Sequence, residues 1–293
     1  MKAKRYTLTW DRWHLELGAG KTCLMGILNV TPDSFSDGGE YVTLEDAVAQ
    51  GLHLEEAGAD ILDIGGESTR PFSEPVSAEE EIRRVCPVIE SLAKRLSIPI
   101  SIDTTKAAVA RRALDAGAAI VNDIAALRFD PDMAPLAAER KVPVILMHML
   151  GTPKTMQVDP HYDDVIKDIR AFLEDAVQRA IQAGIPKDRI VVDPGIGFGK
   201  TLAHNLNLIR RLGELAALNC PILMGPSRKS FVRNILKQHL PEGTDPDRDR
   251  IIFGTMGAVA ACILNGAHML RVHDVARIKP LVEVIDAIQS SEN

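Results

Sequence analysis

A short apolar run followed by a helix-like segment recurs along most of this chain, and the alternation restricts the folds that the sequence can adopt. The predicted strands cover residues 24–28, 60–66, 98–103, 120–123, 142–147, 190–193, 221–225 and 268–272. Three predicted helices stop at a glycine directly before the next strand, at Gly58, Gly117 and Gly266, as expected of short connections that need a left-handed residue. Eight strands, each followed by a helix, favour an α/β fold that closes as a single (β/α)8 TIM barrel over an open doubly wound sheet.

The helical segments and the chain start complete this outline. The predicted helices cover residues 43–57, 77–96, 105–116, 131–141, 164–183, 203–218, 249–264 and 275–290, with an insertion before the seventh. Residues 1–22 alternate weakly between polar and apolar side chains, which predicts a hairpin-like N-terminal extension that closes the barrel bottom. Residues 23–293 contain no linker long enough to divide them, so we expect one barrel domain.

Composition excludes several classes of partner. The net charge is −6 and the isoelectric point is about 5.8, and no polybasic stripe appears, so we expect no nucleic-acid partner. No apolar run is long enough to cross a bilayer and no signal peptide is apparent, which predicts no membrane association. The four cysteines lie far apart without metal-ligand or redox spacing, as expected of core residues in a reducing cytoplasm.

The first strand runs into an unusual polar loop. Residues 24–39 read LMGILNVTPDSFSDGG, in which buried-type residues give way abruptly to oxygen-bearing side chains and two glycines. Loops after buried parallel strands bind ligands and hard cations in α/β proteins. Taken alone, the segment is equally typical of an ordinary βα turn, because Thr-Pro-Asp and Asp-Gly-Gly form turns in many proteins.

Polar residues recur where the other predicted strands end. They are Asn29, Glu67–Arg70, Asp103, Asn122–Asp123, His148, Asp193, Ser227–Ser230, Arg271 and His273. Each has an ordinary structural explanation by itself, such as a helix cap or a turn. In a barrel, however, all these positions converge on one mouth, where catalytic groups lie. The complete ring therefore predicts an active site.

The charges of this ring indicate the kind of ligand. Four cations, Arg70, Arg228, Lys229 and Arg271, stand at the mouth of an otherwise acidic chain and suit a phosphate or diphosphate. The side chain of Asn29 could bind a Mg²⁺ ion that takes its other ligands from phosphate and water.

A second group of residues suits a flat heterocycle. Asp103, Asn122 and Asp193 can accept from and donate to the edge of a planar, amino-substituted ring. Met147 and Phe198 are placed to cover its face, although each could equally belong to the core.

The same phrases resemble the dihydropteroate synthase family of the folate pathway, over residues 24–284. They are GILNVTPDSFSDGG at 26–39, DIGGESTRP at 63–71, SIDT at 101–104, VNDI at 121–124, MHMLGTPKTMQ at 147–157, DPGIGFGK at 193–200, SRKSF at 227–231 and RVHDV at 271–275. The resemblance implies a (β/α)8 barrel, usually a homodimer. It also implies an enzyme that joins 6-hydroxymethyl-7,8-dihydropterin diphosphate to 4-aminobenzoate, giving 7,8-dihydropteroate and diphosphate.

The resemblance also implies roles for single residues. The implied pterin-binding residues are Asp103, Asn122, Asp193, Lys229, Met147 and Phe198; the diphosphate contacts are Asn29, Thr69, Arg271 and His273; and the aminobenzoate contacts are Thr69, Pro71, Phe35 and Ser230. Asn29 is the implied Mg²⁺ ligand, and Lys229, Arg271 and His273 are the implied catalytic residues. The implied reaction is dissociative, without a covalent enzyme intermediate, so catalysis rests on positioning and charge stabilisation.

Two positions depart from the family pattern. The family usually has glycine where this chain has Phe72, and often has glycine where this chain has Arg233. Phe72 follows the expected aminobenzoate contacts, so we hypothesise altered loop dynamics or sulfonamide affinity. A Phe72→Gly variant with unchanged inhibitor binding would remove that idea. Arg233 is expected on the surface of a short helix after Lys229.

Two other functions remain open at this stage. A pterin-binding methyltransferase module would share the Asp-Asn-Asp edge but has no need of Arg271, His273 or the long first loop. A non-catalytic pterin carrier would have lost the reaction. Residues 250–264 are apolar or small nearly all round, which predicts burial of a second helix face in a homodimer.

Overall fold

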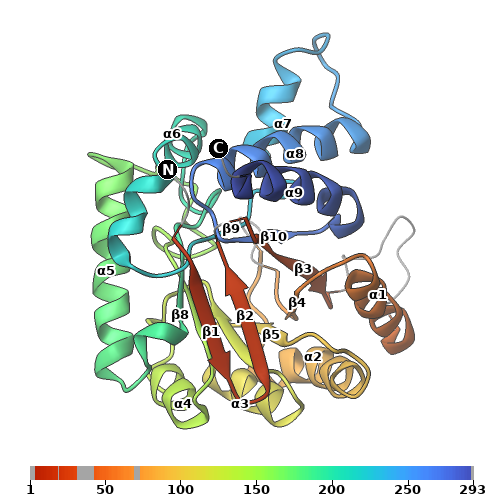
Figure 1. Cartoon of the computed structure of the whole chain (residues 1–293), viewed down its shortest axis with the longest axis vertical. Helices are drawn as coiled ribbons and strands as arrows, with labels where there is room; N and C mark the ends of the chain where they lie inside the picture. The colour runs from red at the N-terminus through yellow and green to blue at the C-terminus, as the bar shows by residue number, and fades with distance from the viewer. Residues whose placement is uncertain (1–3, 19, 32–42, 69–72, 292–293) are drawn as a thin grey trace.

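The computed structural model describes residues 4–18, 20–31, 43–68 and 73–291 of the chain. It begins with an antiparallel hairpin of β1 (Tyr6–Trp10) and β2 (Trp13–Leu17). Eight parallel strands follow, each bordered by helices that form an outer layer (Figure 1). The expected hairpin and the expected α/β barrel are both confirmed.

The barrel strands follow one another in space almost as they do in sequence. They are β3 (Cys23–Asn29), β4 (Ile61–Gly65), β5 (Ile100–Asp103), β6 (Ile120–Asp123), β7 (Val144–Met147), β8 (Ile190–Asp193), β9 (Leu223–Met224) and β10 (Met269–Val272). The order is β8-β7-β6-β5-β4-β3-β10-β9. A parallel bridge between Val192 and Ile222 links β8 to the segment before β9 and closes the ring.

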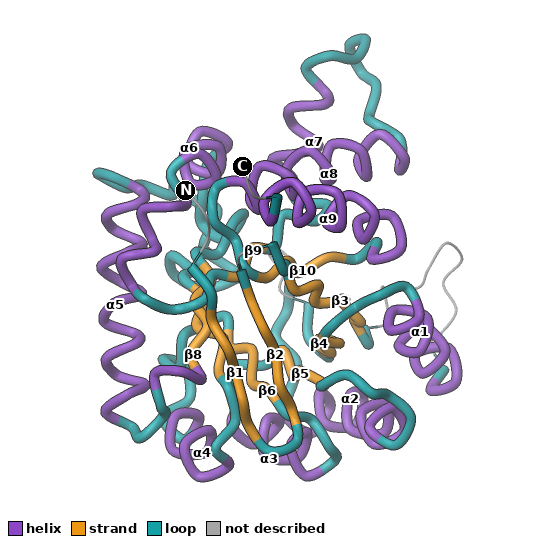
Figure 2. Tube along the Cα trace, in the orientation of Figure 1, coloured by secondary structure: helices purple, strands orange, loops and turns teal. Residues whose placement is uncertain are grey.

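The helices lie outside the strands (Figure 2). They are α1 (Leu44–Glu56), α2 (Ala78–Ala93), α3 (Ala107–Asp115), α4 (Met133–Arg140), α5 (Val165–Gln182), α6 (Leu202–Arg210), α7 (Ser230–Lys237), α8 (Arg248–Leu264) and α9 (Val275–Ser290), with 3-10 turns η1 (Lys187–Arg189) and η2 (Leu212–Leu218). Gly58, Gly117 and Gly266 have φ of 96°, 114° and 106°, so the expected left-handed helix stops are present. Within the described ranges, no helix combines the length and apolar character needed to cross a membrane.

Side chains that point into the barrel form layers. Ile61, Met269 and six other strand residues join Leu8, Trp10 and Leu17 of the hairpin in one apolar cluster at the amino-terminal ends of the strands. The hairpin lies in front of the barrel strands in Figure 1. Because alternate residues of a strand face the same side, the next inward positions of β4 and β10 are Asp63 and Arg271. The barrel is therefore apolar at one end and charged towards the other.

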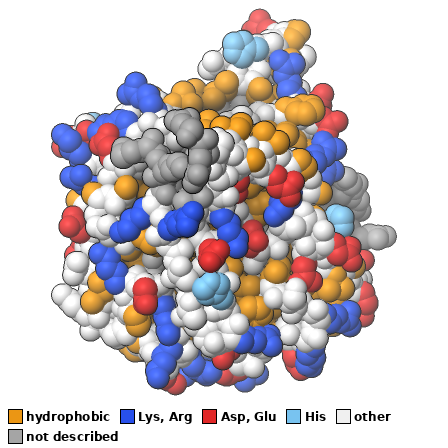
Figure 3. Space-filling model, viewed as in Figure 1, with side chains coloured by type: hydrophobic (Ala, Val, Ile, Leu, Met, Phe, Trp, Pro, Cys, Tyr) orange, Lys and Arg blue, Asp and Glu red, His pale blue; other side chains and the backbone are white. Residues whose placement is uncertain are grey.

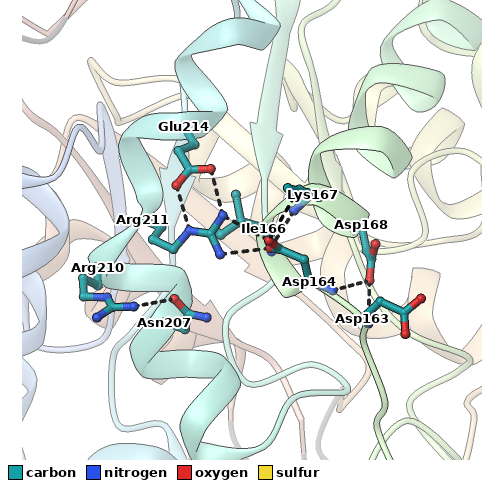
Figure 4. Close-up of polar contacts among 9 residues, drawn as sticks. All are labelled: Asp163, Asp164, Ile166, Lys167, Asp168, Asn207, Arg210, Arg211 and Glu214. Carbon is teal, nitrogen blue, oxygen red and sulfur yellow. Dashed lines mark hydrogen bonds and ion pairs between the residues drawn. The ribbon is translucent and has the colours of Figure 1, made fainter.

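The single helix expected over residues 203–218 is wrong. The structure has α6 and then η2, with Arg211 at the junction. Figure 4 shows why: the Arg211 guanidinium donates to Asp164, at 3.0 and 3.2 Å, and to Glu214, at 2.7 and 3.0 Å. Asp164 also caps α5 by accepting from Ile166 N. Bonds from two elements to one side chain fix the break, and local sequence could not reveal the distant partner.

The predicted insertion after residue 225 contains α7, which projects with its following loop beyond the barrel (Figure 1). The chain places Lys229 at the N-cap of this helix. Arg233 lies exposed on it, as expected.

Candidate active site

The strand pairing brings the predicted site residues into one row. Asn29 is opposite Gly65, Gly65 is opposite Asp103, and Asp103 is opposite Asn122 in the registers of β3 to β6. Met147 is likewise opposite Asp193 in β7 and β8. Gly65 lies between Asn29 and Asp103 in this row, and a Cβ added there would be at ordinary contact distance, 3.5 Å from the Asp103 Cβ and 3.8 Å from the Asn29 Oδ1.

A pocket opens at this carboxyl end of the strands. It is lined by Asp103, Asn122, Ile124, Met147, Asp193, Ile196, Phe198, Gly225, Lys229 and Arg271. The complete set expected to bind the pterin is therefore present, and Arg271 of the expected diphosphate set joins it. These side chains come from strands or loops between β5 and β10, so the pocket depends on the closed barrel.

Arg271 lies between two carboxylates. Its Nε donates to Asp63 Oδ2 at 2.6 Å, and its Nη2 donates to Asp103 Oδ2 at 2.7 Å. Asn122 Nδ2 donates to the same Oδ2 of Asp63 at 3.1 Å. Although burial lowers the pKa of Arg271, the two carboxylates raise it above its ordinary value. The guanidinium is thus a fixed positive charge beside the pocket.

The two pocket carboxylates titrate at unusual pH. Burial raises the pKa of Asp103 to about 7, against the attraction of Arg271, and the nearby charge of Asp63 adds to the rise. Burial raises the pKa of Asp193 to about 6, although the backbone N–H of Gly195 donates to its Oδ1 at 2.7 Å and thereby favours the ionised form. Both side chains therefore change charge close to neutral pH.

Lys229 and Phe198 lie together in the pocket lining. The Lys229 Nζ lies 3.9 Å from the centroid of the Phe198 ring, a cation–π contact. Burial lowers the pKa of Lys229 to about 8, and the neighbouring Arg271 contributes to the decrease. A planar ligand entering here meets an aromatic face, a cation and two acidic groups.

A glycine-rich loop positions Phe198. Gly195 requires the absence of a side chain, because an added Cβ would lie 1.9 Å from the carbonyl oxygen of His148. The buried Lys200 Nζ bonds to Gly195 O at 2.8 Å, to Phe198 O at 3.0 Å and to His148 Nδ1 at 3.1 Å. Three acceptors match the three donors of an ammonium group, so these hydrogen bonds of Lys200 hold the loop in place.

Several predicted residues do not line the pocket. Asn29 is at the end of β3 in the same row, and Ser230 is exposed in the first turn of α7. His273 is two residues beyond Arg271, with its Nδ1 3.0 Å from Ser227 Oγ. Burial lowers the pKa of His273 to about 3, assisted by nearby arginines. His273 is therefore neutral at physiological pH and offers a hydrogen bond rather than a positive charge.

Other predictions cannot be placed. Thr69, Pro71, Phe35 and Phe72 lie outside the described residues, as does Arg70. Arg228, expected among the mouth cations, has its Nε 2.9 Å from Asp274 Oδ2. Arg228 is therefore ion-paired, as Arg271 is with Asp63 and Asp103, but unlike Arg271 it does not line the pocket.

The donor set near Asn29 is compatible with Mg²⁺ supplied with phosphate ligands. Among the described residues, no group of three or more His, Cys, Asp or Glu side chains could hold a metal ion, so a complete protein cage is absent from those ranges. Mg²⁺ bound by one protein oxygen, substrate phosphates and water needs no such cage. The amide oxygen of Asn29, in the same row as Asp103, is a ligand of the required type.

Sequence reasoning missed two functional candidates. Asp63 has an exposed fraction of 0% and bonds to both Arg271 and Asn122. A lone carboxylate inside an otherwise apolar strand was the signal that could have identified it. Lys200 ends the phrase DPGIGFGK at 193–200, but no role was predicted for it from sequence. Its position after three closely spaced glycines could have indicated a loop that needs internal fastening.

Comparison with known proteins places this geometry in a family. The model of the pterin binding enzyme family matches residues 25–273. A dihydropteroate synthase from Synechocystis is 47% identical over 268 residues, covering 92% of this chain and 90% of that protein.

Two solved structures agree with that match. A Xanthomonas albilineans dihydropteroate synthase structure with 4-aminobenzoic acid has 44% identity and a TM-score of 0.87, covering 99% of this chain and 100% of that one. A second structure from that organism, in complex with 7,8-dihydropteroate, has 42% identity and a TM-score of 0.84, covering 98% and 100%.

The barrel and its pocket thus define a pterin-binding enzyme. More narrowly, the chain belongs to the dihydropteroate synthase family, whose members are transferases.

Proposed function

We propose that this chain joins 6-hydroxymethyl-7,8-dihydropterin diphosphate to 4-aminobenzoate, giving 7,8-dihydropteroate and diphosphate in the folate pathway. The observation that carries the proposal is the pocket in which Asp103, Asn122 and Asp193 face the cations Lys229 and Arg271. Acidic and amide groups suit the amino-substituted edge of a pterin, and cations suit the diphosphate. The solved relative that contains 7,8-dihydropteroate supports the assignment.

The pterin ring is proposed to lie over Met147 and against Phe198. Its edge donors reach Asp193 and Asn122, and Lys229 reaches its ring acceptors. This orientation points the methylene carbon towards the mouth, where Arg271 approaches the diphosphate. Because the groups are held by strand ends and by bonds beneath the pocket, little reorganisation is needed when the substrate binds.

In the proposed reaction, the bond between the methylene carbon and the diphosphate oxygen breaks first, and its electron pair leaves with the diphosphate. The amine nitrogen of 4-aminobenzoate then forms the new bond and releases a proton to solvent. Arg271 stabilises the departing negative charge, and neutral His273 donates a hydrogen bond to it. No side chain acts as nucleophile. Asn29 would hold a Mg²⁺ ion, which would supply further neutralisation of the diphosphate charge.

The aminobenzoate is proposed to enter beside Ser230, with Phe35, Thr69 and Pro71 completing its site. Ser230 begins α7, so the aminobenzoate carboxylate approaches the positive end of a helix. The relative solved with 4-aminobenzoic acid supports the presence of such a site.

A diphosphate-release assay tests this reaction. The wild-type chain with Mg²⁺ should release diphosphate and form dihydropteroate when both substrates are present. A chain that binds methyltetrahydrofolate but releases no diphosphate would instead support the methyltransferase module. Pterin binding without any turnover would support the carrier, and either result would contradict the proposal.

We further propose a homodimer that acts in the cytoplasm. Helix α8 exposes Phe253 and Leu264, with exposed fractions of 67% and 58%. An apolar groove lies between α6, α7 and α8, lined by residues that include Phe231, Ile235 and Ala258. In Figure 3 hydrophobic side chains also gather towards the top of the face, in the region of α8 and α9 in Figure 1. These apolar surfaces suit a self-complementary interface.

Sedimentation tests the dimer. The wild-type chain should sediment as a dimer at micromolar concentration, and Phe253→Glu should shift it towards the monomer. The control is Lys94→Glu. Lys94 is an exposed residue at the C-cap of α2, away from α8, and its replacement should leave the dimer intact. A monomeric wild type would contradict this proposal.

A further inference from the structure

One buried carboxylate touches two pocket residues without lining the pocket itself. Asp63 has an exposed fraction of 0%, and its Oδ2 accepts from Arg271 Nε at 2.6 Å and from Asn122 Nδ2 at 3.1 Å. The pocket lining includes both of these partners. Asp63 therefore lies one layer below the ligand and can act on it only through its neighbours.

The chemistry of this contact fixes the direction of the Asn122 amide. A carboxylate paired with a guanidinium only accepts hydrogen bonds, so Asn122 must turn its NH₂ group towards Asp63. Its carbonyl oxygen is then left to face the ligand. An Asn without such a partner could present either end.

We propose that Asp63 is a positioning residue that sets ligand specificity by holding Asn122 with its oxygen towards the pocket. Three oxygen-bearing groups, from Asp103, Asn122 and Asp193, then face the ligand from the ends of β5, β6 and β8. This arrangement selects heterocycles whose edge presents hydrogen-bond donors, such as a 2-aminopyrimidine ring. It rejects analogues that present an oxygen at the same position, because two acceptors would oppose each other in a buried site.

The same oxygen of Asp63 restrains Arg271, so the two effects need to be separated. The bond to Nε holds the guanidinium beside Asp103, on the side expected to meet the diphosphate. Loss of this restraint should change the use of the diphosphate substrate. Because Arg271 also bonds to Asp103, its release could affect heterocycle binding through that carboxylate as well. The two routes are therefore separated by removing Asn122, as described below.

The inference rests on the proposed function and is tested by calorimetry with two probes, 6-hydroxymethylpterin and its 2-oxo analogue 6-hydroxymethyllumazine. Wild type should prefer the pterin, and Asp63→Asn should lower that preference at least about tenfold, because Asn122 can now turn over. The KM for 4-aminobenzoate should stay within about twofold. An unchanged preference would overturn the inference.

The chain offers a matched control for the loss of a buried carboxylate. Asp123 also has an exposed fraction of 0%, but its oxygens accept from the backbone N–H groups of Ala125 and Leu127, at 2.7 and 2.9 Å. Asp123→Asn should lower the melting temperature without changing the preference between the two probes. If it changes the preference as much as Asp63→Asn does, the effect is general loosening and the inference fails.

A double-mutant cycle identifies the route. In an Asn122→Leu background, Asp63→Asn should no longer alter heterocycle selectivity, because the residue through which it acts is gone. If the full effect persists there, Asp63 does not act through Asn122.

The inference stays testable if Asp63→Asn does not fold. The side-chain amide of Asn122 in wild type, assigned by its loss in Asn122→Leu, should give exchange-protected ¹H–¹⁵N signals with and without pterin. Signals that become protected only when pterin binds would overturn the inference. Failure of wild type to bind pterin would instead contradict the proposed function itself, so the two outcomes are distinguishable.

Discussion

The two ends of the barrel use opposite kinds of interaction. At the amino-terminal ends of the strands, Leu8, Trp10 and Leu17 of the hairpin pack with strand residues in a hydrophobic cluster. At the carboxyl ends, Asp63, Asp103 and Arg271 form a buried ionic network. Apolar packing gains free energy without directional demands, whereas buried charges are costly unless each has its partner.

This difference separates stability from function along the barrel axis. The sealed end can stabilise the fold without contacting the ligand, while the open end keeps charges that the fold alone does not require. Buried ion pairs are weak evidence for stability, since apolar replacements often stabilise a protein. The ionic network is better explained by what it holds in position. Substitutions at the two ends should therefore have opposite consequences.

The largest effect is expected at the sealed end. Trp10 has an exposed fraction of 2%, so Trp10→Ala should lower the free energy of unfolding by about 3–5 kcal/mol. The kcat should remain near that of wild type at temperatures where the variant is folded. Chemical denaturation and steady-state kinetics measure the two quantities. Trp13→Ala, at the more exposed turn of the hairpin, is the control and should cost less. A large loss of kcat in folded Trp10→Ala would contradict the idea that the two ends of the barrel serve stability and activity separately.

The second effect belongs to the open end. Arg271→Ala should lower kcat by about 10²–10³-fold, the usual cost of removing a group that stabilises developing charge. Diphosphate release under saturating substrates measures it. Arg277→Ala, which removes an exposed arginine paired with Asp249 on the outer surface, should change kcat less than about twofold. Equal losses in both variants would show that Arg271 has no special role.

The third effect comes from pH and sharpens the comparison. The pKa of Asp103 is raised to about 7 and that of Asp193 to about 6. If pterin binds the ionised forms, its affinity should fall as the pH drops below about 7, by up to about tenfold per unit for each proton taken up. Isothermal titration from pH 5 to 8 measures this dependence.

The ligand-free protein should respond to pH in the other direction. These two carboxylates have folded-state pKa values above their unfolded values, so the folded state binds protons more readily between about pH 4 and 7. Their contribution to stability is therefore highest at acid pH and is lost as the pH rises through about 7. The melting temperature of the ligand-free wild type should therefore fall as the pH rises towards 7, and Asp103→Asn should weaken this dependence. If wild type and Asp103→Asn show the same pH dependence, the role given to these carboxylates is contradicted.

Much of the fold and the ligand-facing ring could be predicted from sequence. Apolar runs ending in polar residues place Asp103, Asn122 and Asp193 at the same level of a parallel barrel, because strand ends in this fold converge. The registers that join Asn29, Gly65 and Asp103 agree with that expectation. Residue type and position at a strand end were sufficient to predict that these side chains lie in one site.

What could not be predicted depends on contacts between distant residues. Asp63 is a single acidic residue in a buried strand, and its partner Arg271 is 208 residues away. The helix break at Arg211 likewise depends on Asp164, 47 residues earlier. Arg228 was expected to bind phosphate, but it forms an ion pair with Asp274, another residue distant in sequence. Local patterns record which residues are polar but not which distant groups they meet.

The contact between Asp63 and Arg271 has a consequence for synthesis of the chain. β4 emerges from the ribosome early, but β10, which pairs with β3 and contains Arg271, is the last strand to be made. Until β10 has been made, Asp63 lacks its partner Arg271, and the pocket lacks one of its lining residues. A nascent chain therefore cannot capture its substrate, and ligand capture marks the moment at which the first and last barrel strands have met.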